Sequence, residues 1–194
     1  HSYKIMVDID NSELIKPTLN IDYKINSDLL IFLNKFYIYC KVKKFSNHKQ
    51  WLDNIRTIDN EFPTIKPKYK NNEKNINSYY FIDLLSESIK DNTCIVTDMG
   101  TSYTCTMQAL KIKKNNIRLF TSSASCSMGF GLPGIIGSYY SKKYNNYILI
   151  TGDGGIQMNI QELQCINHNK IPIKIFLLNN SGYAAIKIMQ KNLF

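Results

Sequence analysis

Short apolar runs, separated by polar or glycine-rich stretches, mark the second half of the chain. The runs at residues 94–97, 117–121, 147–151 and 173–178 have the length and composition of buried β-strands. Between them, apolar residues recur at three- and four-residue steps, as on one face of a helix. This alternation predicts an α/β fold built on a doubly wound parallel sheet from Cys94 onward.

Helical segments are predicted around these strands from the same three- and four-residue spacing. They are residues 78–89 with Ser78 as the cap, residues 103–110, residues 134–140, and a stretch with Ile160, Leu163 and Ile166 on one face. The last segment joins two strands of the predicted sheet, so that strand, helix and strand form a parallel βαβ unit.

The first part of the chain shows a weaker pattern. An apolar run at Tyr3–Ile9 is followed by the start of a short helix at Ser12. Asn26–Asp28 is an N-cap cluster for an apolar helix over residues 29–36. Residues 39–77 are the least regular stretch, and their prolines and Lys/Asn-rich run predict a linker.

Polar residues follow the last two predicted strands at the point where each strand ends. Gly152-Asp153-Gly154 follows the first of them, and Asn179-Asn180 follows the second. The carboxyl ends of parallel strands form the ligand crevice of open α/β sheets. A carboxylate and an amide oxygen suit Mg²⁺, which also takes phosphate oxygens as ligands. An ordinary turn with a helix N-cap is the alternative, and for the tripeptide alone it is the favoured one.

Glycines beside these polar residues extend the hypothesis of a phosphate and metal site. Gly154 and Gly155 open the following helix without side chains, so that backbone N–H groups can receive a diphosphate. Gly182 allows a sharp turn that lets a backbone carbonyl complete a metal shell.

The spacing of these motifs resembles that of the thiamine diphosphate (ThDP) enzyme superfamily. Asp153 and Asn180 are 27 positions apart (180 − 153), as in the family signature of Gly-Asp-Gly followed by Asn-Asn. The resemblance implies that Asp153, Asn180 and the Gly182 carbonyl hold Mg²⁺. It also implies that the cofactor contacts a further group of residues, namely Gly152, Gly154, Gly155 and Tyr183.

A second motif, Met128-Gly-Phe-Gly-Leu-Pro133, resembles a segment of acetolactate synthase-like enzymes within this superfamily. In that family the residue at the Met128 position wedges between the two rings of ThDP and holds the cofactor in a bent V shape. The Cys126 carbonyl and the Met128 N–H would then bond the aminopyrimidine ring. Alternatively, the motif is a glycine-rich turn with a methionine in the core.

A further stretch, directly after the first predicted strand of the sheet, matches the family less specifically. Gly100, Thr101 and Ser102 correspond to a strand end that touches the diphosphate, although Thr101 and Ser102 are equally interpreted as helix caps. The resemblance also implies that residues 1–38 are the end of a middle α/β domain and that residues 78–194 are the ThDP/Mg-binding domain. The chain is expected to be an excerpt of a longer protein that ends before this domain does.

Departures from the family leave the acceptor substrate open. Ser123-Ala124 stands where acetolactate synthases usually have Gly-Gly, and Cys126 where they have Gly. The Ser181-Gly182-Tyr183 loop is more like that of the decarboxylases, whose catalytic glutamate is replaced here by Ala185 and Ile186.

Composition excludes several other classes of function. The net charge of +9 would suit nucleic acid, but the lysines are scattered and no nucleic-acid-binding motif accompanies them. The sequence contains no apolar run of transmembrane length and no signal-peptide pattern, so no membrane partner and a cytoplasmic location are expected. Five dispersed cysteines indicate free thiols in a reducing compartment.

The resemblance implies ThDP- and Mg²⁺-dependent decarboxylation of a 2-oxo acid, with pyruvate expected, and transfer of the two-carbon unit to a second carbonyl. The alternatives are a carboligase acting on a keto sugar or another ketone, a simple decarboxylase, and a non-catalytic ThDP-fold module. The full-length protein is expected to be a homodimer or homotetramer. The chain alone is expected to be inactive, because the family's catalytic glutamate belongs to another domain and Glu87 and Glu162 do not replace it.

Overall fold

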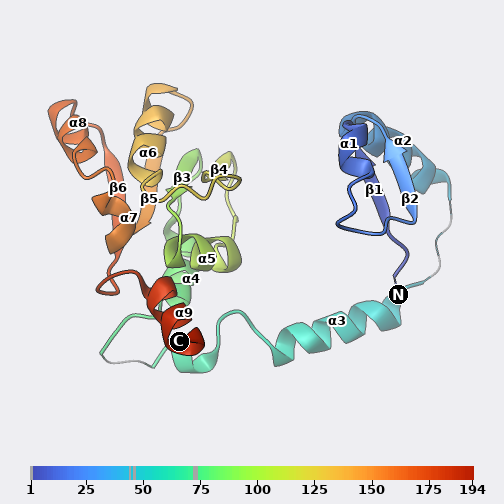
Figure 1. Cartoon of the computed structure of the whole chain (residues 1–194), viewed down its shortest axis with the longest axis horizontal. Coiled ribbons are helices and arrows are strands. Elements are labelled where there is room, and N and C mark those ends of the chain that lie inside the picture. The colour runs from blue at the N-terminus through green and yellow to red at the C-terminus, as the bar shows by residue number, and fades with distance from the viewer. Residues whose placement is uncertain (1, 44, 46, 72–73) are drawn as a thin grey trace. The chain divides into compact units, whose positions relative to one another are not determined.

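The computed structural model describes residues 2–43, 45, 47–71 and 74–194, and it divides into two compact units (Figure 1). Residues 1–58 form the N-terminal unit and residues 59–194 form the C-terminal unit. This division falls inside the predicted linker, residues 39–77, of which Lys44, Ser46, Asn72 and Glu73 lie outside the described residues. The boundaries of the predicted domains, 1–38 and 78–194, stay a prediction.

The N-terminal unit contains a two-stranded parallel sheet of β1 (Ile5–Asp8) and β2 (Tyr23–Asn26). Helix α1 (Asn11–Leu14) connects the strands, and α2 (Leu29–Val42) follows them. Asp28 is the N-cap of α2 as predicted, and its Oδ1 accepts the N–H groups of Leu30 and Ile31. Strand β2 was not predicted, because it is short and becomes a strand only through its pairing with β1.

The stretch predicted as an irregular linker is more helical than its sequence suggested. Helix α2 continues to Val42, and α3 spans Lys49–Glu61, where neither proline nor glycine interrupts the backbone. A short 3₁₀ turn, η1 (Pro67–Tyr69), follows. Within the described residues, none of the helices combines the length and the apolar character that crossing a bilayer requires.

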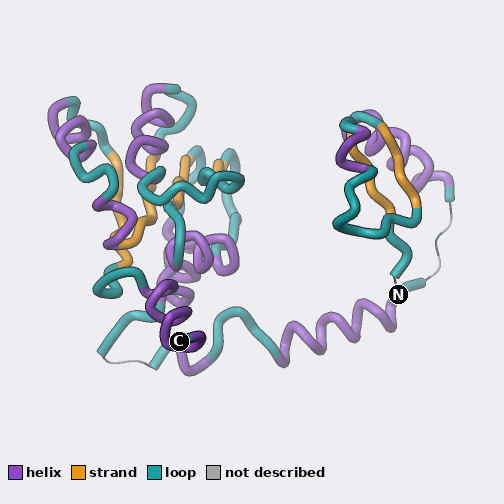
Figure 2. Tube along the Cα trace, in the orientation of Figure 1, coloured by secondary structure: helices purple, strands orange, loops and turns teal. Residues whose placement is uncertain are grey.

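The C-terminal unit is built on a four-stranded parallel sheet in the order β4-β3-β5-β6. Its strands are β3 (Thr93–Thr97), β4 (Ile117–Phe120), β5 (Asn146–Gly152) and β6 (Ile173–Leu178). These bounds differ by at most a residue from the predicted runs, and the predicted α/β fold with a parallel sheet is confirmed. Figure 2 shows strand and helix alternating along this unit.

Helices cover both faces of this sheet, so the sheet is doubly wound. Helices α4 (Ser78–Ser88) and α5 (Thr101–Ala109) pack through Ile82, Leu85 and Cys105 against one face. On the other face lie α6 (Gly131–Tyr140), α7 (Asp153–Gln157) and α8 (Glu162–His168). Helix α9 (Ala184–Leu193) follows β6.

Two details of the predicted helices were wrong. The cap of α4 is Asn77, whose Oδ1 accepts the N–H groups of Tyr79 and Tyr80, and not Ser78. The single helix predicted around Ile160 is divided into α7 and α8. Between them Asn159 donates from Nδ2 to the Gly129 carbonyl at 2.9 Å, which holds this turn against another loop.

Candidate functional site

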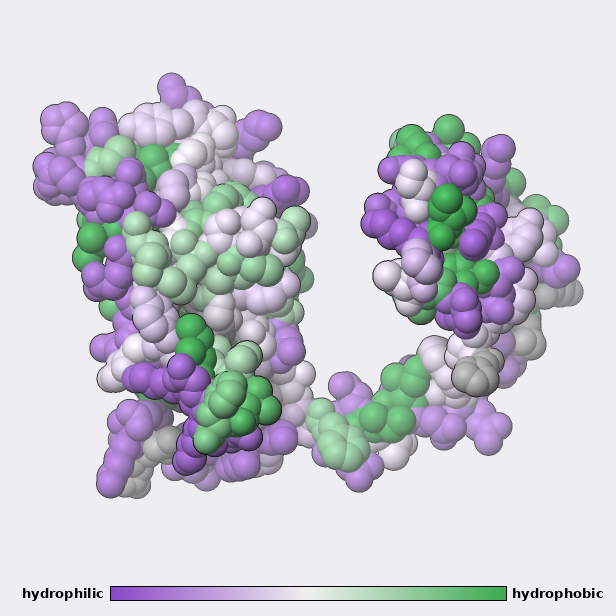
Figure 3. Space-filling view, in the orientation of Figure 1, coloured by the Kyte–Doolittle hydropathy of each residue, from purple (hydrophilic) through white to green (hydrophobic). Residues whose placement is uncertain are grey.

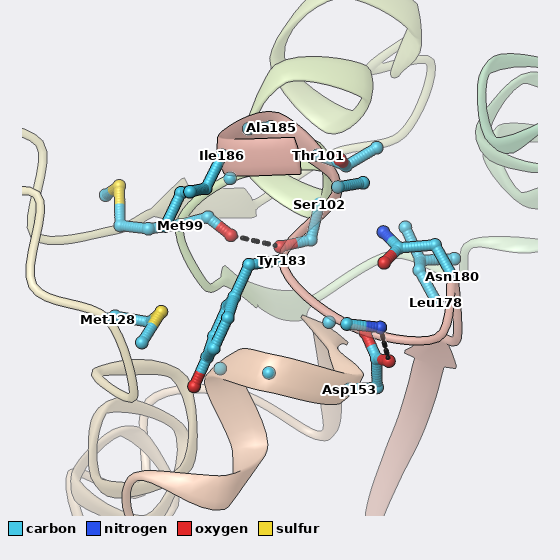
Figure 4. Close-up of a pocket in the computed structure, with 16 residues that line it drawn as sticks. Met99, Thr101, Ser102, Met128, Asp153, Leu178, Asn180, Tyr183, Ala185 and Ile186 are labelled. Carbon is cyan, nitrogen blue, oxygen red and sulfur yellow. Dashed lines mark hydrogen bonds between the residues drawn. The ribbon is translucent and has the colours of Figure 1, made fainter. Parts of the chain in front are cut away.

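The carboxyl ends of β3, β5 and β6 meet around one cavity of about 180 Å³ (Figure 4). Its walls come from residues 99–102, Met128, residues 152–155, Leu178, Asn180 and residues 182–186. The structure therefore brings together the Gly-Asp-Gly and Met-Gly-Phe-Gly-Leu-Pro motifs. All the predicted site residues except Cys126 line this cavity: Gly100, Thr101, Ser102, Met128, Gly152, Asp153, Gly154, Gly155, Asn180, Gly182 and Tyr183.

The three predicted metal ligands lie on one side of the cavity. The Gly182 N–H donates to Asp153 Oδ2 at 2.7 Å and ties the loop after β6 to the first residue of α7. Among the described residues, no hydrogen bond reaches the other carboxylate oxygen of Asp153. The Gly182 carbonyl accepts the Ala184 N–H at 2.9 Å and keeps a second lone pair. All three residues line the cavity, and Asp153 contributes the one carboxylate among them.

The protein offers few negatively charged ligands to a cation on this side of the cavity. In the described part of the chain, no three His, Cys, Asp or Glu side chains gather into a metal-binding group. One carboxylate with neutral oxygens leaves a divalent ion undersaturated, as Mg²⁺ sites that also bind substrate phosphates are. The donor set thus fits a metal that arrives with a phosphorylated ligand.

Two glycines leave open backbone in the predicted diphosphate site, Gly100 before α5 and Gly152 at the end of β5. Gly100 has a φ of +78°, in the region that favours glycine, and a Cβ built there or at Gly152 would touch nothing within 4 Å. The Ser102 side chain is buried, and its hydroxyl donates to the carbonyls of Asp98 and Met99. For Ser102 this geometry favours the structural interpretation over a direct diphosphate contact.

Tyr183 crosses the cavity between its two ends. Figure 4 shows its ring pointing toward α7, with Met128 on one side and Asp153 on the other. A Cβ built on Gly154 would lie 2.5 Å from Tyr183 Cε1, so only glycine lets the ring lie on this helix. The position of Tyr183 therefore depends on the second glycine of Gly-Asp-Gly.

Met128 faces the cavity and is not a core residue. Its side chain is 41% exposed and lies on the far side of the Tyr183 ring from Asp153 (Figure 4). The alternative of a methionine packed in the core is therefore wrong. The Met128 thioether gives the cavity a flexible apolar wall opposite its polar end.

Cys126 is the one predicted site residue that the structure leaves outside the cavity. It has a φ of +49°, and its N–H donates to the Ser122 carbonyl at 2.8 Å. The next N–H, that of Ser127, donates to Ser122 Oγ. This tight turn exposes Cys126, and its thiol contacts the Ser123 carbonyl.

Asp98 is a residue of the site whose role the sequence did not reveal. It is 1% exposed at the end of β3, and its carboxylate accepts three hydrogen bonds. Oδ1 accepts the N–H groups of Met99 at 2.8 Å and Gly129 at 2.9 Å, and Oδ2 accepts the Thr151 hydroxyl at 3.1 Å. The available signal was a charged residue directly after a wholly buried strand.

Comparison with known proteins identifies the family of this chain. Residues 98–194, half of its length, match the family described as "Thiamine pyrophosphate enzyme, C-terminal TPP binding domain". The chain belongs to this family. The predicted cofactor is therefore confirmed, since thiamine pyrophosphate is another name for ThDP.

The relatives of this thiamine pyrophosphate enzyme chain include acetolactate synthases. It is 32% identical over 188 residues to the acetolactate synthase large subunit of Lactococcus lactis, covering 97% of the chain and 32% of that protein. It is 28% identical to the acetolactate synthase isozyme 1 large subunit of Escherichia coli, and the match covers 98% of the chain and 32% of that protein. It is 32% identical to acetolactate synthase 1, chloroplastic, of Zea mays, and the match covers 91% of the chain and 27% of that protein. The chain thus spans about a third of the length of these relatives.

The residues that line the cavity suit the cofactor of this family, because polar groups lie at one end and an apolar side chain lies at the other. Its polar end offers a carboxylate, an amide and open glycine backbone, which suit a metal and a diphosphate. Its other end offers the Met128 side chain, which suits the apolar faces of aromatic rings.

Proposed function

We propose that the protein to which this chain belongs decarboxylates a 2-oxo acid, pyruvate, and transfers the two-carbon unit to a second carbonyl, as an acetolactate synthase-like enzyme. The observation that supports this proposal is the cavity that joins Met128 to Asp153 and Asn180. These residues belong to two separate motifs, and the sheet places both motifs at one edge. ThDP and Mg²⁺ are the proposed cofactors.

The proposed role of the polar end is to anchor the cofactor. Asp153, Asn180 and the Gly182 carbonyl hold Mg²⁺, and the metal in turn holds the diphosphate. The backbone N–H groups of Gly152, Gly154 and Gly155 are proposed to donate to the phosphates, and at Gly152 a Cβ would meet nothing within 4 Å. Gly100 and Thr101 do the same from the end of β3, and Ser102 supports them by anchoring its hydroxyl to backbone.

The proposed role of the apolar end is to set the geometry of the bound rings. When bound, ThDP supplies the nucleophilic carbon that attacks the 2-oxo acid. Met128, which lines the apolar end of the cavity, would hold the two rings of the cofactor bent toward each other. The Met128 N–H is the proposed backbone contact for the aminopyrimidine, whereas Cys126, whose carbonyl was the other predicted contact, does not line the cavity.

The acceptor is proposed to be a small carbonyl compound. Ala184, Ala185 and Ile186 line the cavity beside Tyr183 with apolar side chains. Apolar walls leave the hydroxyl groups of a sugar without partners, which disfavours a keto-sugar acceptor. A second 2-oxo acid, which presents a methyl or ethyl group beside its carbonyl, suits this wall better.

The catalytic glutamate is proposed to come from another domain, across a subunit interface of a homo-oligomer in the cytoplasm. Neither glutamate of the C-terminal unit named above stands in the cavity. Glu87 pairs with Lys113 on the surface, and Glu162 begins α8. Both positions support a structural role for these residues.

Product analysis tests the proposed reaction. The intact protein is given Mg²⁺, ThDP and ¹³C-labelled pyruvate, with and without a second 2-oxo acid, and the products are followed by NMR. Acetolactate-type products are expected. Acetaldehyde alone would indicate a simple decarboxylase, and a protein that binds no ThDP would indicate a non-catalytic module.

Substitution of Asp153 tests the proposed metal site. Asp153→Ala removes the one charged ligand, so the affinity for ThDP with Mg²⁺ should fall roughly 10- to 100-fold. Thr101→Ala, in the first turn of α5, is the matched control and should cost less. Calorimetric titration of both variants of the intact protein measures the difference, and equal losses would contradict the assignment.

A further inference from the structure

The carboxylate of Asp98 joins three loops that surround the cavity. Its first oxygen binds backbone next to Met99, at the end of β3, and backbone at Gly129, in the motif that begins with Met128. Its second oxygen binds the Thr151 hydroxyl, at the end of β5 and just before Asp153. Met99 and Met128 both line the cavity, whereas Asp98 does not. The carboxylate therefore lies behind the cavity wall and holds it.

The surrounding glycines show how closely this carboxylate is enclosed. A Cβ built on Gly155 would lie 2.9 Å from Asp98 Oδ2, and one built on Gly131 would lie 3.2 Å from the same oxygen. Both distances are shorter than ordinary van der Waals contact. Helices α6 and α7 thus approach Asp98 through residues without side chains.

Both backbone polar groups of Gly129, the residue after Met128, are hydrogen-bonded. Asp98 Oδ1 accepts the Gly129 N–H at 2.9 Å, and Asn159 Nδ2 donates to the Gly129 carbonyl at 2.9 Å. Gly129 has a φ of +89°, so this turn needs glycine and its direction is set by these two hydrogen bonds. The direction of the Met128 side chain into the cavity follows from the orientation of this backbone.

We infer that Asp98 is a positioning residue, which acts through the backbone of residues 128–129 to hold Met128 against the rings of the bound cofactor. The inference rests on the proposed function, because it gives Met128 the wedge role. Asp98 itself does not line the cavity. Its contribution is the acceptor geometry of the carboxylate and not the charge.

Two substitutions separate geometry from charge. Asp98→Ala leaves the N–H groups of Met99 and Gly129 without this acceptor, which frees the loop at residues 128–129. Asp98→Asn keeps a carbonyl oxygen in place of Oδ1, where it can still accept both N–H groups. Its amide nitrogen then faces Thr151, whose hydroxyl can accept from it and donate to the Gly152 carbonyl, 3.3 Å away.

A third variant controls for a general loss of stability. Ser86 is also almost fully buried, and its Oγ donates to the Ile82 carbonyl and accepts the Lys111 N–H. It lies on α4 away from the cavity lining. Ser86→Ala therefore removes a buried polar side chain with two hydrogen bonds to backbone, as Asp98→Ala does, but leaves the cavity lining unchanged.

The readouts are ThDP affinity, by calorimetry, and the rate at which the C2 proton of bound ThDP exchanges with deuterium, by quenched-flow NMR. Both are measured in the intact protein with Mg²⁺. Asp98→Ala should slow the exchange about 100-fold, as a misplacement near 1 Å does, while the affinity falls by no more than about tenfold. Asp98→Asn should recover most of the exchange rate, and Ser86→Ala should change neither readout.

Three outcomes would overturn the inference. An exchange rate in Asp98→Asn as low as in Asp98→Ala would show that the charge acts and not the geometry. Equal effects of Asp98→Ala and Ser86→Ala would show a general structural role. An undiminished effect of Asp98→Ala in a Met128→Ala background would show that it does not act through Met128.

Failure of the proposed function is distinguishable from these outcomes. A wild-type protein that binds no ThDP would overturn both the function and the inference. A wild-type protein that binds ThDP and exchanges the C2 proton, with Asp98→Ala unaffected, would overturn the inference alone.

Discussion

The two units of the chain contain similar strands and helices but bury them differently. In the C-terminal unit, β3 is buried at all five of its positions and β5 at five of seven. In the N-terminal unit, Leu14 is the one buried hydrophobic residue among those that the structure describes. Four strands covered by helices on both faces enclose a core, whereas two strands do not.

Helix α2 illustrates the consequence of this difference in burial. Its sequence is strongly apolar, yet none of its residues is buried, and Figure 3 shows hydrophobic side chains at the surface of this unit. Leu30, Phe36 and Ile38 are each at least half exposed. An apolar pattern therefore predicts that a helix can pack, but burial requires a second layer that the pattern does not supply.

Thiol reactivity should show the largest contrast between the units. Burial raises the pKa of the Cys94 and Cys105 thiols, so at neutral pH they stay protonated, and the thiolate is the reactive form. Cys40, on α2, is only half-buried. Cys94 and Cys105 should react with iodoacetamide about 1000-fold more slowly than Cys40, since labelling requires opening of the core. Peptide mass spectrometry of the native protein measures these rates, and similar rates would refute the contrast.

Truncation of apolar side chains should show the next largest contrast. Ile150→Ala creates a cavity in the buried strand β5 and should lower the free energy of unfolding of the C-terminal unit by about 3 kcal/mol. Ile38→Ala, on the exposed helix α2, should stay within about 0.5 kcal/mol. Hydrogen exchange of amides in each unit reports the two values. A comparable loss at Ile38 would mean that α2 is buried in the intact protein.

Glycine substitutions sharpen the comparison within the C-terminal unit, which contains all nine glycines of the chain. Gly155→Ala puts a methyl group against Asp98 and should cost about 2 kcal/mol. Gly137→Ala, in α6, meets nothing within 4 Å and should add about 0.7 kcal/mol of stability through helix propensity. Urea unfolding of both variants compares them, and a tolerated Gly155→Ala would contradict the close enclosure of Asp98.

Local signals in the sequence determined the strands of the C-terminal sheet and most of the cavity. A buried strand needs only a short apolar run, so β3, β5 and β6 could be recognised one at a time. Parallel strands place their carboxyl ends together, so the strand pattern alone made Asp153 and Asn180 neighbours. The cap of α2 at Asp28 is a local hydrogen-bond pattern of the same predictable kind.

Only the tertiary structure decided the features that depend on partners far away in the chain. Strand β2 exists through β1, and the turn between α7 and α8 is held by Gly129. Asp98 accepts hydrogen bonds from Gly129 and Thr151, which are 31 and 53 residues away in the chain. Hydrogen bonds between such residues form only once the strand order is set, and periodicity along the chain contains no information about which buried donors will meet a given carboxylate.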